Sequence, residues 1–144
     1  MQTPPLTRSI GAAERAMRAL LEHKLANARL SFAEWTVLVF LKDSALPPEQ
    51  VSQRQLSGHV VSDLAQGQQS LDTLLSRGLI CTENPGGSLV QTPGGAEVFK
   101  QLSEEIENMI GMLYGDLPIT DLEATHRTVT EIAKRANALM AQAS

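Results

Sequence analysis

Residues 52–79 carry the feature that most constrains the fold of this chain, a pattern of two short helices joined by a turn. Ser52 and Gln55 have the spacing of a capping box, which predicts that the first helix starts there. Ser62 is placed to cap the second helix, and Asp63 after it suits the positive end of a helix dipole. The stretch is therefore predicted to be a helix-turn-helix.

The second helix leads into a predicted hairpin. One face of this helix is expected to be buried, because leucines recur on it at helical spacing: Leu64, Leu71, Leu74 and Leu75. Gly78 is placed where a left-handed residue commonly ends a helix. Residues 79–82 and 89–92 are predicted to be strands around the turn Asn84–Pro85–Gly86–Gly87. Helix, turn, helix and hairpin in this order indicate a winged helix-turn-helix.

The segment before this unit predicts a central helix. Ser31 and Glu34 form a second capping box, and Leu30 and Trp35 have the spacing of a hydrophobic staple. The predicted helix over residues 32–42 is apolar almost all round, which is typical of a helix in the middle of a fold. Trp35 is therefore expected to be a core anchor.

Long helices are predicted on both sides of the winged unit. The first covers residues 6–30 and carries an apolar stripe at nearly heptad spacing: Ile10, Ala13, Met17, Leu20 or Leu21, and Ala28. After the hairpin, Thr92 and Pro93 form an N-cap and a proline at the first helical position, which predicts a second long helix. Thr120 and Glu123 form a third capping box and predict the start of the last helix.

The stripes on these terminal helices have little left to cover within one chain. Symmetric pairing of two chains would bury them and place two recognition helices side by side. The expected architecture is one domain over residues 1–144, mostly α with a small β-hairpin wing. It comprises a winged helix-turn-helix over 31–92 and dimerisation helices over 6–30 and 93–144.

Length and composition agree with a helical, single-domain protein. The chain has 144 residues, and only 3% of them are aromatic while Leu and Ala dominate the apolar set. The net charge of −4 does not by itself suggest a nucleic-acid partner, so the local distribution of basic residues matters more. No cleavable signal is recognised, and the longest apolar run, Val37–Leu41, is too short to cross a bilayer. We expect a cytoplasmic protein without a membrane partner.

Uncharged polar side chains on the second helix of the motif are the candidates for reading DNA bases: Gln66, Gln68, Gln69 and Thr73. A glutamine amide can pair with adenine N6 and N7 in the major groove. Further DNA contacts are expected from Arg54, Ser62, Arg77 and Ser88. Gly67 costs the helix roughly 1 kcal/mol relative to Ala, and it either lets backbone approach the duplex or merely weakens the helix. The alternative is an uncharged face in contact with solvent.

Motifs for catalysis, metal binding or cofactor binding are not recognised, so no enzyme is predicted. The single cysteine, Cys81, is expected to be a buried small hydrophobe rather than an oxidant sensor, because no Lys, Arg or His adjoins it in sequence to stabilise a thiolate. A ligand is expected in the cleft between the first helix, the central helix and the motif. His23, Trp35 and His59 would supply an aromatic wall with imidazole donors for an aromatic carboxylate or phenol.

The chain resembles the MarR family of bacterial regulators over nearly its whole length, and four segments carry the resemblance. They are Phe32–Leu38 in the central helix, Gln55–Leu56 in the motif, Leu71–Ile80 at the exit of the second helix, and Val90–Gly95 after the hairpin. The resemblance implies a dimeric winged-helix protein that binds palindromic operators, usually as a repressor. It also implies small phenolic or lipophilic effectors between the dimerisation and DNA-binding parts.

The predicted hairpin departs from the family pattern, in which an arginine of the wing reaches the minor groove. Residues 82–89 contain neither Lys nor Arg, and residues 52–92 carry two basic side chains against three acidic ones. This departure motivates an alternative function, a winged-helix dimer that has lost operator binding. Such a protein would act as a protein-interaction or ligand-sequestering module.

Overall fold

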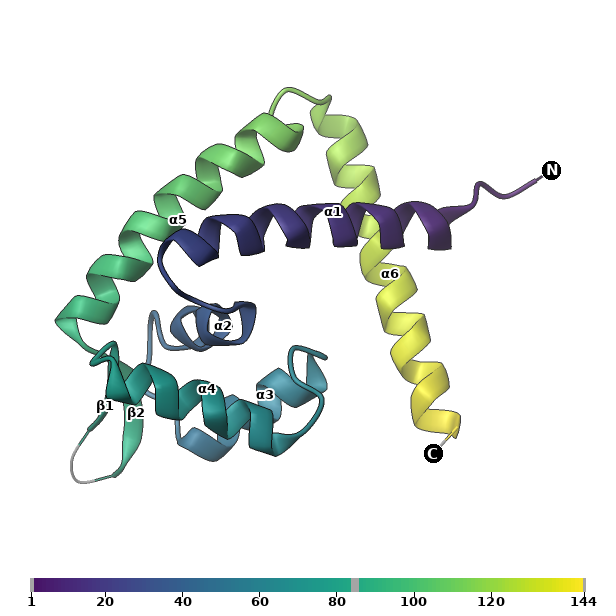
Figure 1. The fold of residues 1–144 in the computed structure, drawn as a ribbon. Helices are drawn as coiled ribbons and strands as arrows, with labels where there is room; N and C mark the ends of the chain where they lie inside the picture. Colours follow the sequence, from purple (N-terminus) through teal and green to yellow (C-terminus); the bar gives the residue numbers. More distant parts are fainter. Residues whose placement is uncertain (1, 84–85, 144) are drawn as a thin grey trace. The chain divides into compact units, whose positions relative to one another are not determined.

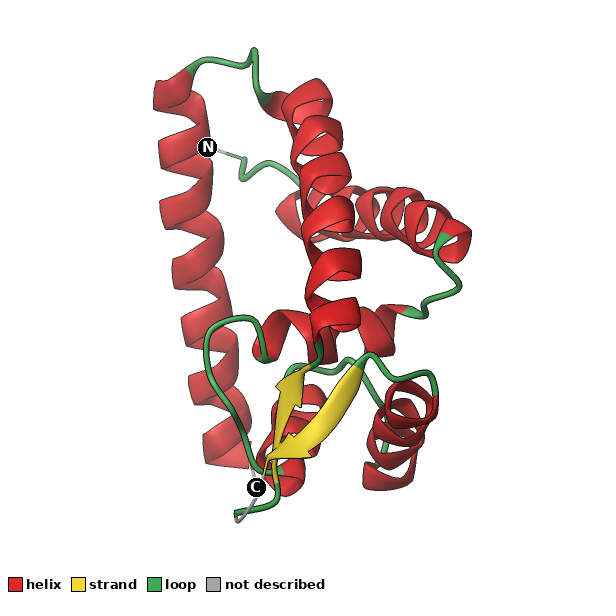
Figure 2. Ribbon diagram, turned by 90° about the vertical axis from the view of Figure 1, so that its left-hand side faces the viewer, coloured by secondary structure: helices red, strands yellow, loops and turns green. Residues whose placement is uncertain are grey.

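The computed structural model describes residues 2–83 and 86–143, which form helices and one small antiparallel sheet. The elements follow in the order α1 (Leu6–Asn27), α2 (Phe32–Phe40), α3 (Pro48–Ser57), α4 (Leu64–Ser76), β1 (Ile80–Glu83), β2 (Ser88–Gln91), α5 (Pro93–Tyr114) and α6 (Ile119–Ala143) (Figure 1). Strands β1 and β2 form a hairpin with Ile80 opposite Gln91 (Figure 2). The predicted mostly α fold with a small hairpin is confirmed.

The chain divides into two compact units, Met1–Ile106 and Glu107–Ser144. The core of the first unit is built around α2, where Val37 and Leu38 are completely buried. The predicted capping box at the start of α2 is confirmed: the Glu34 amide donates to Ser31 Oγ at 3.1 Å, and the Ser31 amide donates to Glu34 Oε1 at 3.0 Å. Completely buried side chains from α1, α3, α4 and the hairpin complete this core: Leu25, Val51, Leu71, Leu74, Ile80 and Leu89.

The starts of α3 and α4 differ from the predictions. Helix α3 begins at Pro48, because a proline at the first helical position needs no hydrogen-bond acceptor for its nitrogen. The predicted capping box at Ser52 and Gln55 is therefore wrong, and both residues lie inside the helix and are buried. The cap of α4 is Asp63 rather than Ser62, with Asp63 Oδ1 accepting from the Gln66 amide at 2.9 Å.

Other details of the helices also differ. Helix α1 ends at Asn27 instead of residue 30, and Arg29 follows with a positive φ of 58°. Helix α6 already starts at Ile119, so the predicted capping box at Thr120 is wrong as well. Helix α4 buries Leu71 and Leu74, but Leu64 and Leu75 are 48% and 38% exposed and do not share that face.

The start of α5 follows the prediction and is packed closely on the chain that enters β1. The Gly95 amide donates to Thr92 Oγ1 at 3.0 Å, and the Thr92 hydroxyl donates to the Gly78 carbonyl at 2.6 Å. The Thr92 amide donates to the Leu79 carbonyl at 3.1 Å. Gly95 is buried against Leu79, where a side chain would have no room. This junction holds α5 against the winged unit.

Apolar side chains remain exposed in both units. On α1, Met17 is 43% exposed, and Leu25 is the buried residue of that helix. In the second unit, the described part of α6 has no buried residue, although it carries Ile132, Leu139 and Met140. Among residues 2–83 and 86–143, no helix is long and apolar enough to cross a membrane.

Candidate nucleic-acid interface

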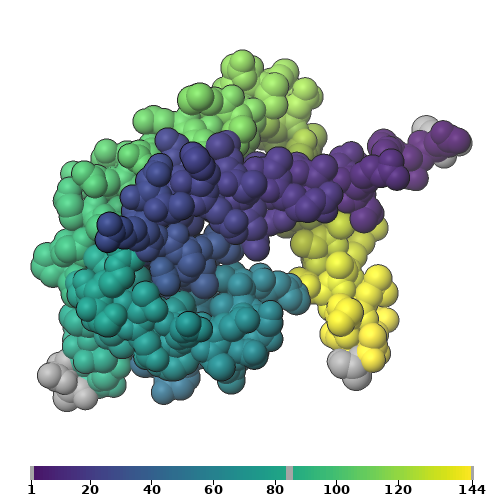
Figure 3. Space-filling view, in the orientation of Figure 1, coloured from purple at the N-terminus to yellow at the C-terminus, as the bar shows by residue number. Residues whose placement is uncertain are grey.

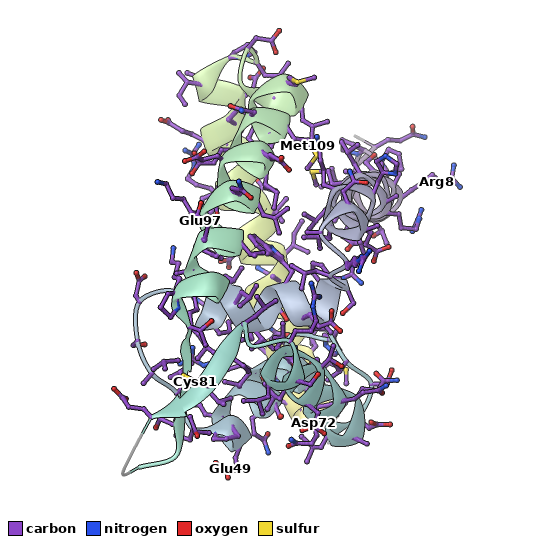
Figure 4. The ribbon with its side chains drawn as sticks, turned by 60° about the vertical axis from the view of Figure 1, so that its left-hand side comes forward. Arg8, Glu49, Asp72, Cys81, Glu97 and Met109 are labelled. Atoms are coloured by element: carbon purple, nitrogen blue, oxygen red, sulfur yellow. The ribbon has the colours of Figure 1, made fainter. Side chains whose placement is uncertain are left out.

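The exposed surface of helix α4 carries uncharged polar side chains and one carboxylate, Asp72, because the small and apolar residues of the helix face the core. Gly67, Ser70, Leu71 and Leu74 are buried, and the opposite face is exposed. Residues at steps of three and four along that face are Ala65, Gln69, Asp72 and Ser76. Figure 4 labels Asp72 on α4 and Glu49 on α3. Helices α3 and α4 lie side by side at the surface of the first unit (Figure 3).

Gly67 is the contact point of α4 with α3. A Cβ atom at this position would lie 3.2 Å from Ser52 Oγ and 3.3 Å from Gln55 Oε1. Because Gly67 is buried in this contact, the interpretation that it lets backbone approach the duplex is wrong. The missing side chain lets α3 approach α4, and it gives DNA no route to the backbone.

The side chain of Gln55 in α3 contacts both other helices of the winged unit, α2 and α4. Its side chain is completely buried, and Nε2 donates to the Ala33 carbonyl at 2.8 Å and to Thr36 Oγ1 at 3.0 Å, both in α2. The Ser70 hydroxyl of α4 donates chiefly to the Gly67 carbonyl at 2.7 Å, and Gln55 Oε1 is a second, longer acceptor at 3.4 Å. A buried amide with all of its groups paired holds the helices in one arrangement. The orientation of α4 is therefore set by α2 and α3.

Of the four polar residues predicted to read bases, Gln66 and Thr73 have side chains that are hydrogen-bonded to nearby backbone, whereas Gln68 and Gln69 are exposed on the outward side. Gln66 Oε1 accepts from the Ser62 amide at 2.8 Å, so the Gln66 side chain closes the first turn of α4. Thr73 donates its hydroxyl back to the Gln69 carbonyl at 3.0 Å. Gln68 and Gln69 are exposed on the outward side, and Gln68 Nε2 donates to Asp72 Oδ1 at 2.9 Å.

The two arginines of the motif have different environments. The Arg77 guanidinium donates to the backbone carbonyls of Ala28 and Arg29, the first at 3.1 Å, and so closes the C-terminal end of α1. Arg54 is exposed on α3, with its guanidinium carbon 5.9 Å from the centre of the Phe40 ring. Of the two arginines in the motif, Arg54 is therefore the one available for a phosphate, because the described hydrogen bonds engage the guanidinium of Arg77.

The charge of the unit is more acidic than the sequence analysis indicated. Because α3 begins at Pro48, Glu49 belongs to the same surface as the exposed carboxylates of Asp63 and Asp72. Residues 48–92 then carry four acidic and two basic side chains, a net charge of −2. One of the two basic side chains, Arg77, is already hydrogen-bonded to carbonyls at the end of α1. The surface is poor in the charges that attract phosphates.

The hairpin is anchored to the core but contributes little charge. Gln91 Nε2 donates to the Leu38 carbonyl at 2.8 Å, and Leu89 exchanges two backbone hydrogen bonds with Leu46. Ser88 is half-buried at the end of β2, opposite Glu83. Residues 84 and 85 of the predicted turn lie outside the described residues. Cys81 is exposed, so the expectation that it is buried is wrong: β1 buries its first residue, Ile80, and the three residues that follow are exposed.

The structure does not gather the predicted ligand residues around an open site. The Trp35 ring is 8% exposed and stacks on Phe99, with centroids 5.2 Å apart. His23 is exposed on α1, and His59 is exposed in the turn after α3 with a positive φ of 59°. In the described part of the chain, no group of three His, Cys, Asp or Glu residues is placed to hold a metal ion.

A groove that the sequence analysis missed lies where α3 and α4 begin. It encloses about 420 Å³ and is lined by Pro48, Glu49, Ser52, Gln53, Leu64, Ala65 and Gln68. The missed signal was the pair Pro47–Pro48, whose second proline begins α3 and so puts Glu49 and Ser52 on the helix that lines the groove. The groove combines amides, a carboxylate and exposed apolar carbons.

Comparison with known proteins identifies the fold of the chain through solved structures. No family model and no curated protein matches the sequence. Among solved structures, the chain is similar to a mutant of MarR from E. coli complexed with operator DNA, at 21% identity over 89% of this chain and 93% of that one, with a TM-score of 0.71.

Two further solved structures are similar to the chain over most of its length. A MarR-family transcriptional regulator from Rhodococcus sp. RHA1 has 18% identity over 91% of this chain and 98% of its own, with a TM-score of 0.71. The transcriptional regulator BldR from Sulfolobus solfataricus has 17% identity over 90% and 93%, with a TM-score of 0.72. The chain therefore has the winged-helix fold of the MarR-family regulators, as its resemblance to that family predicted.

Proposed function

We propose that this chain, which has the MarR-family winged-helix fold, is a sequence-specific DNA-binding transcriptional regulator that acts in the cytoplasm as a homodimer on a palindromic operator. The observation that carries the proposal is the exposed face of α4, held in place by the buried contacts of Gly67 and Gln55. A helix that is fixed by its neighbours and presents amides can read base edges in the major groove. The solved relative with operator DNA supports this use of the fold.

Dimerisation is proposed from the apolar residues that neither unit buries. They include Met17 and Leu20 on α1 and Ile132, Leu139 and Met140 on α6. A second copy of the chain would cover such stripes through a two-fold axis. It would also provide the second recognition helix of a palindromic site, about 34 Å from the first.

The test of DNA binding is selection from random duplexes with the purified full-length protein, followed by affinity measurements at several salt concentrations. Each phosphate neutralised by Lys or Arg contributes about 0.9 to the slope of log affinity against log salt. With Arg54 as the available arginine in each subunit, we expect a slope of about −2 for the dimer. Base contacts by Gln68 and Gln69 then supply the discrimination between sequences.

Arg54→Ala and Arg77→Ala form a matched pair for this prediction. Arg54→Ala is expected to flatten the salt slope, whereas Arg77→Ala leaves the slope unchanged and lowers the free energy of unfolding by about 1 kcal/mol, because Arg77 bonds to carbonyls of α1. A slope that flattens only in Arg77→Ala would contradict this assignment of the two arginines.

A second candidate function is favoured by the charge of the surface. Glu49, Asp63 and Asp72 outnumber the available Arg54, which would suit a module that binds protein or sequesters a ligand instead of an operator. The duplex selection separates the two functions. Enrichment of a palindrome supports the regulator, and recovery of no sequence above background supports the module.

A repressor released by a small aromatic or phenolic effector is the finer form of the proposal, and it rests on the family resemblance. The fluorescence of Trp35 can report effector binding, because its ring stacks on Phe99 in the core next to the motif. Salicylate-like compounds are expected to change Trp35 fluorescence and raise the melting temperature, since a ligand that binds only the folded state stabilises it. An unchanged melting temperature across the panel would remove the effector from the proposal.

A further inference from the structure

Helix α4 begins with an exposed leucine that the core does not use. Leu64 is the first residue of the helix and is 48% exposed, and Ala65 beside it is exposed too. Both line the groove at the start of α3 and α4 together with Gln68. In helix-turn-helix proteins the N-terminal residues of the recognition helix contact base edges. The apolar carbons of Leu64 and Ala65 therefore lie where the proposed operator would be read.

The hydrogen bond from Gln68 to Asp72 fixes the orientation of the amide at this groove. Only the amide nitrogen can donate to a carboxylate, so one hydrogen of Nε2 is engaged with Asp72 Oδ1, which leaves Oε1 free to accept and the second N–H free to donate. An acceptor in the major groove pairs with adenine N6 or cytosine N4. Because residues 64–76 contain neither Arg nor Lys, α4 lacks the side chains that most often bind guanine O6 and N7.

We propose that Leu64 and Ala65 read the 5-methyl groups of thymine, so that each operator half-site has thymine facing the start of α4. The inference rests on the proposed function, because it specifies the bases that the same surface takes. Thymine is the base that offers an apolar group in the major groove, and an exposed leucine beside an alanine is complementary to it. Adenine or cytosine next to it would donate to Gln68 Oε1.

The methyl group can be removed without changing any hydrogen bond by replacing thymine with deoxyuridine. In the selected operator, we expect one or two thymines per half-site at which this replacement weakens binding. Burial of one methyl corresponds to about a four-fold loss in a single half-site and about a fifteen-fold loss when both half-sites are changed. Replacements at other thymines are expected to leave affinity unchanged.

Leu64→Ser is expected to bind the thymine and deoxyuridine operators equally, because the apolar partner of the methyl is gone. Leu75→Ser is the matched control, since Leu75 is exposed at the other end of the same helix and should keep the full difference between the two operators. Ala65→Ser is a second, smaller change at the same groove, which keeps the test decisive if Leu64→Ser lowers the melting temperature.

The outcomes distinguish this inference from the function on which it rests. Tight operator binding that is insensitive to every thymine replacement would overturn the methyl contact and leave the regulator intact. A difference between thymine and deoxyuridine that survives in both Leu64→Ser and Ala65→Ser would overturn the assignment to these residues. Failure to select any duplex would overturn the inference together with the proposed function.

Discussion

Gly95→Ala is expected to destabilise the winged unit strongly, which is the largest effect of a single substitution that the structure predicts. A Cβ atom at this position would lie 2.9 Å from the carbonyl carbon of Leu79 and would overlap its oxygen. That oxygen accepts from the Thr92 amide, so the clash falls on the backbone hydrogen bond between the residue before β1 and the residue before α5. Because backbone cannot move aside as a flexible side chain can, we expect a loss of about 3 kcal/mol or more in the free energy of unfolding, measured by urea titration.

Gly94→Ala is the matched control for this prediction. The nearest atoms to a Cβ at Gly94 are Thr92 Oγ1 at 3.8 Å and the Gly78 carbonyl oxygen at 4.0 Å, which are ordinary contacts. Since alanine favours helix over glycine, this variant should be stabilised by up to about 1 kcal/mol. Equal effects of the two substitutions would show that the junction of α5 with Leu79 is not a close contact in solution.

The second large effect is expected at the apolar stripe of α6. Ile132 and Leu139 are seven residues apart on one face of the helix and are 39% and 66% exposed. The double variant Ile132→Glu/Leu139→Glu should convert the dimer into a monomer, because two charges from each chain would have to be buried between the chains. Operator affinity should then fall by a factor on the order of 100 or more, since the second half-site no longer binds intramolecularly.

Sedimentation at micromolar concentration measures the oligomeric state, and the selected operator measures the affinity. The double variant Thr130→Glu/Asn137→Glu has the same spacing and added charge on the other side of α6, where both residues are exposed. It should remain a dimer with nearly full affinity. A wild-type chain that sediments as a folded monomer, or an Ile132/Leu139 variant that stays dimeric, would contradict the proposed interface.

Several elements of this fold could be predicted because their signals are local. The capping box of Ser31 and Glu34 and the helix start at Thr92 and Pro93 involve residues within one turn of each other, and both are confirmed. The mostly α architecture with its hairpin followed from hydrophobic periodicity, which depends on neighbouring residues only. The family resemblance added the identity of the fold, which the solved structures confirm.

The candidate site was only partly predictable, because its side chains are committed by residues far away in the sequence. Arg77 was expected at a phosphate, yet its carbonyl partner Ala28 lies 49 positions earlier. Gly67 was interpreted within its own helix, whereas its neighbours Ser52 and Gln55 belong to α3. The sequence by itself determined which segments form helices and which faces are apolar. The tertiary structure decided which polar groups are hydrogen-bonded within the protein and which side chains, including apolar Leu64 and polar Gln68 at the groove, remain exposed, since long-range packing settles that choice.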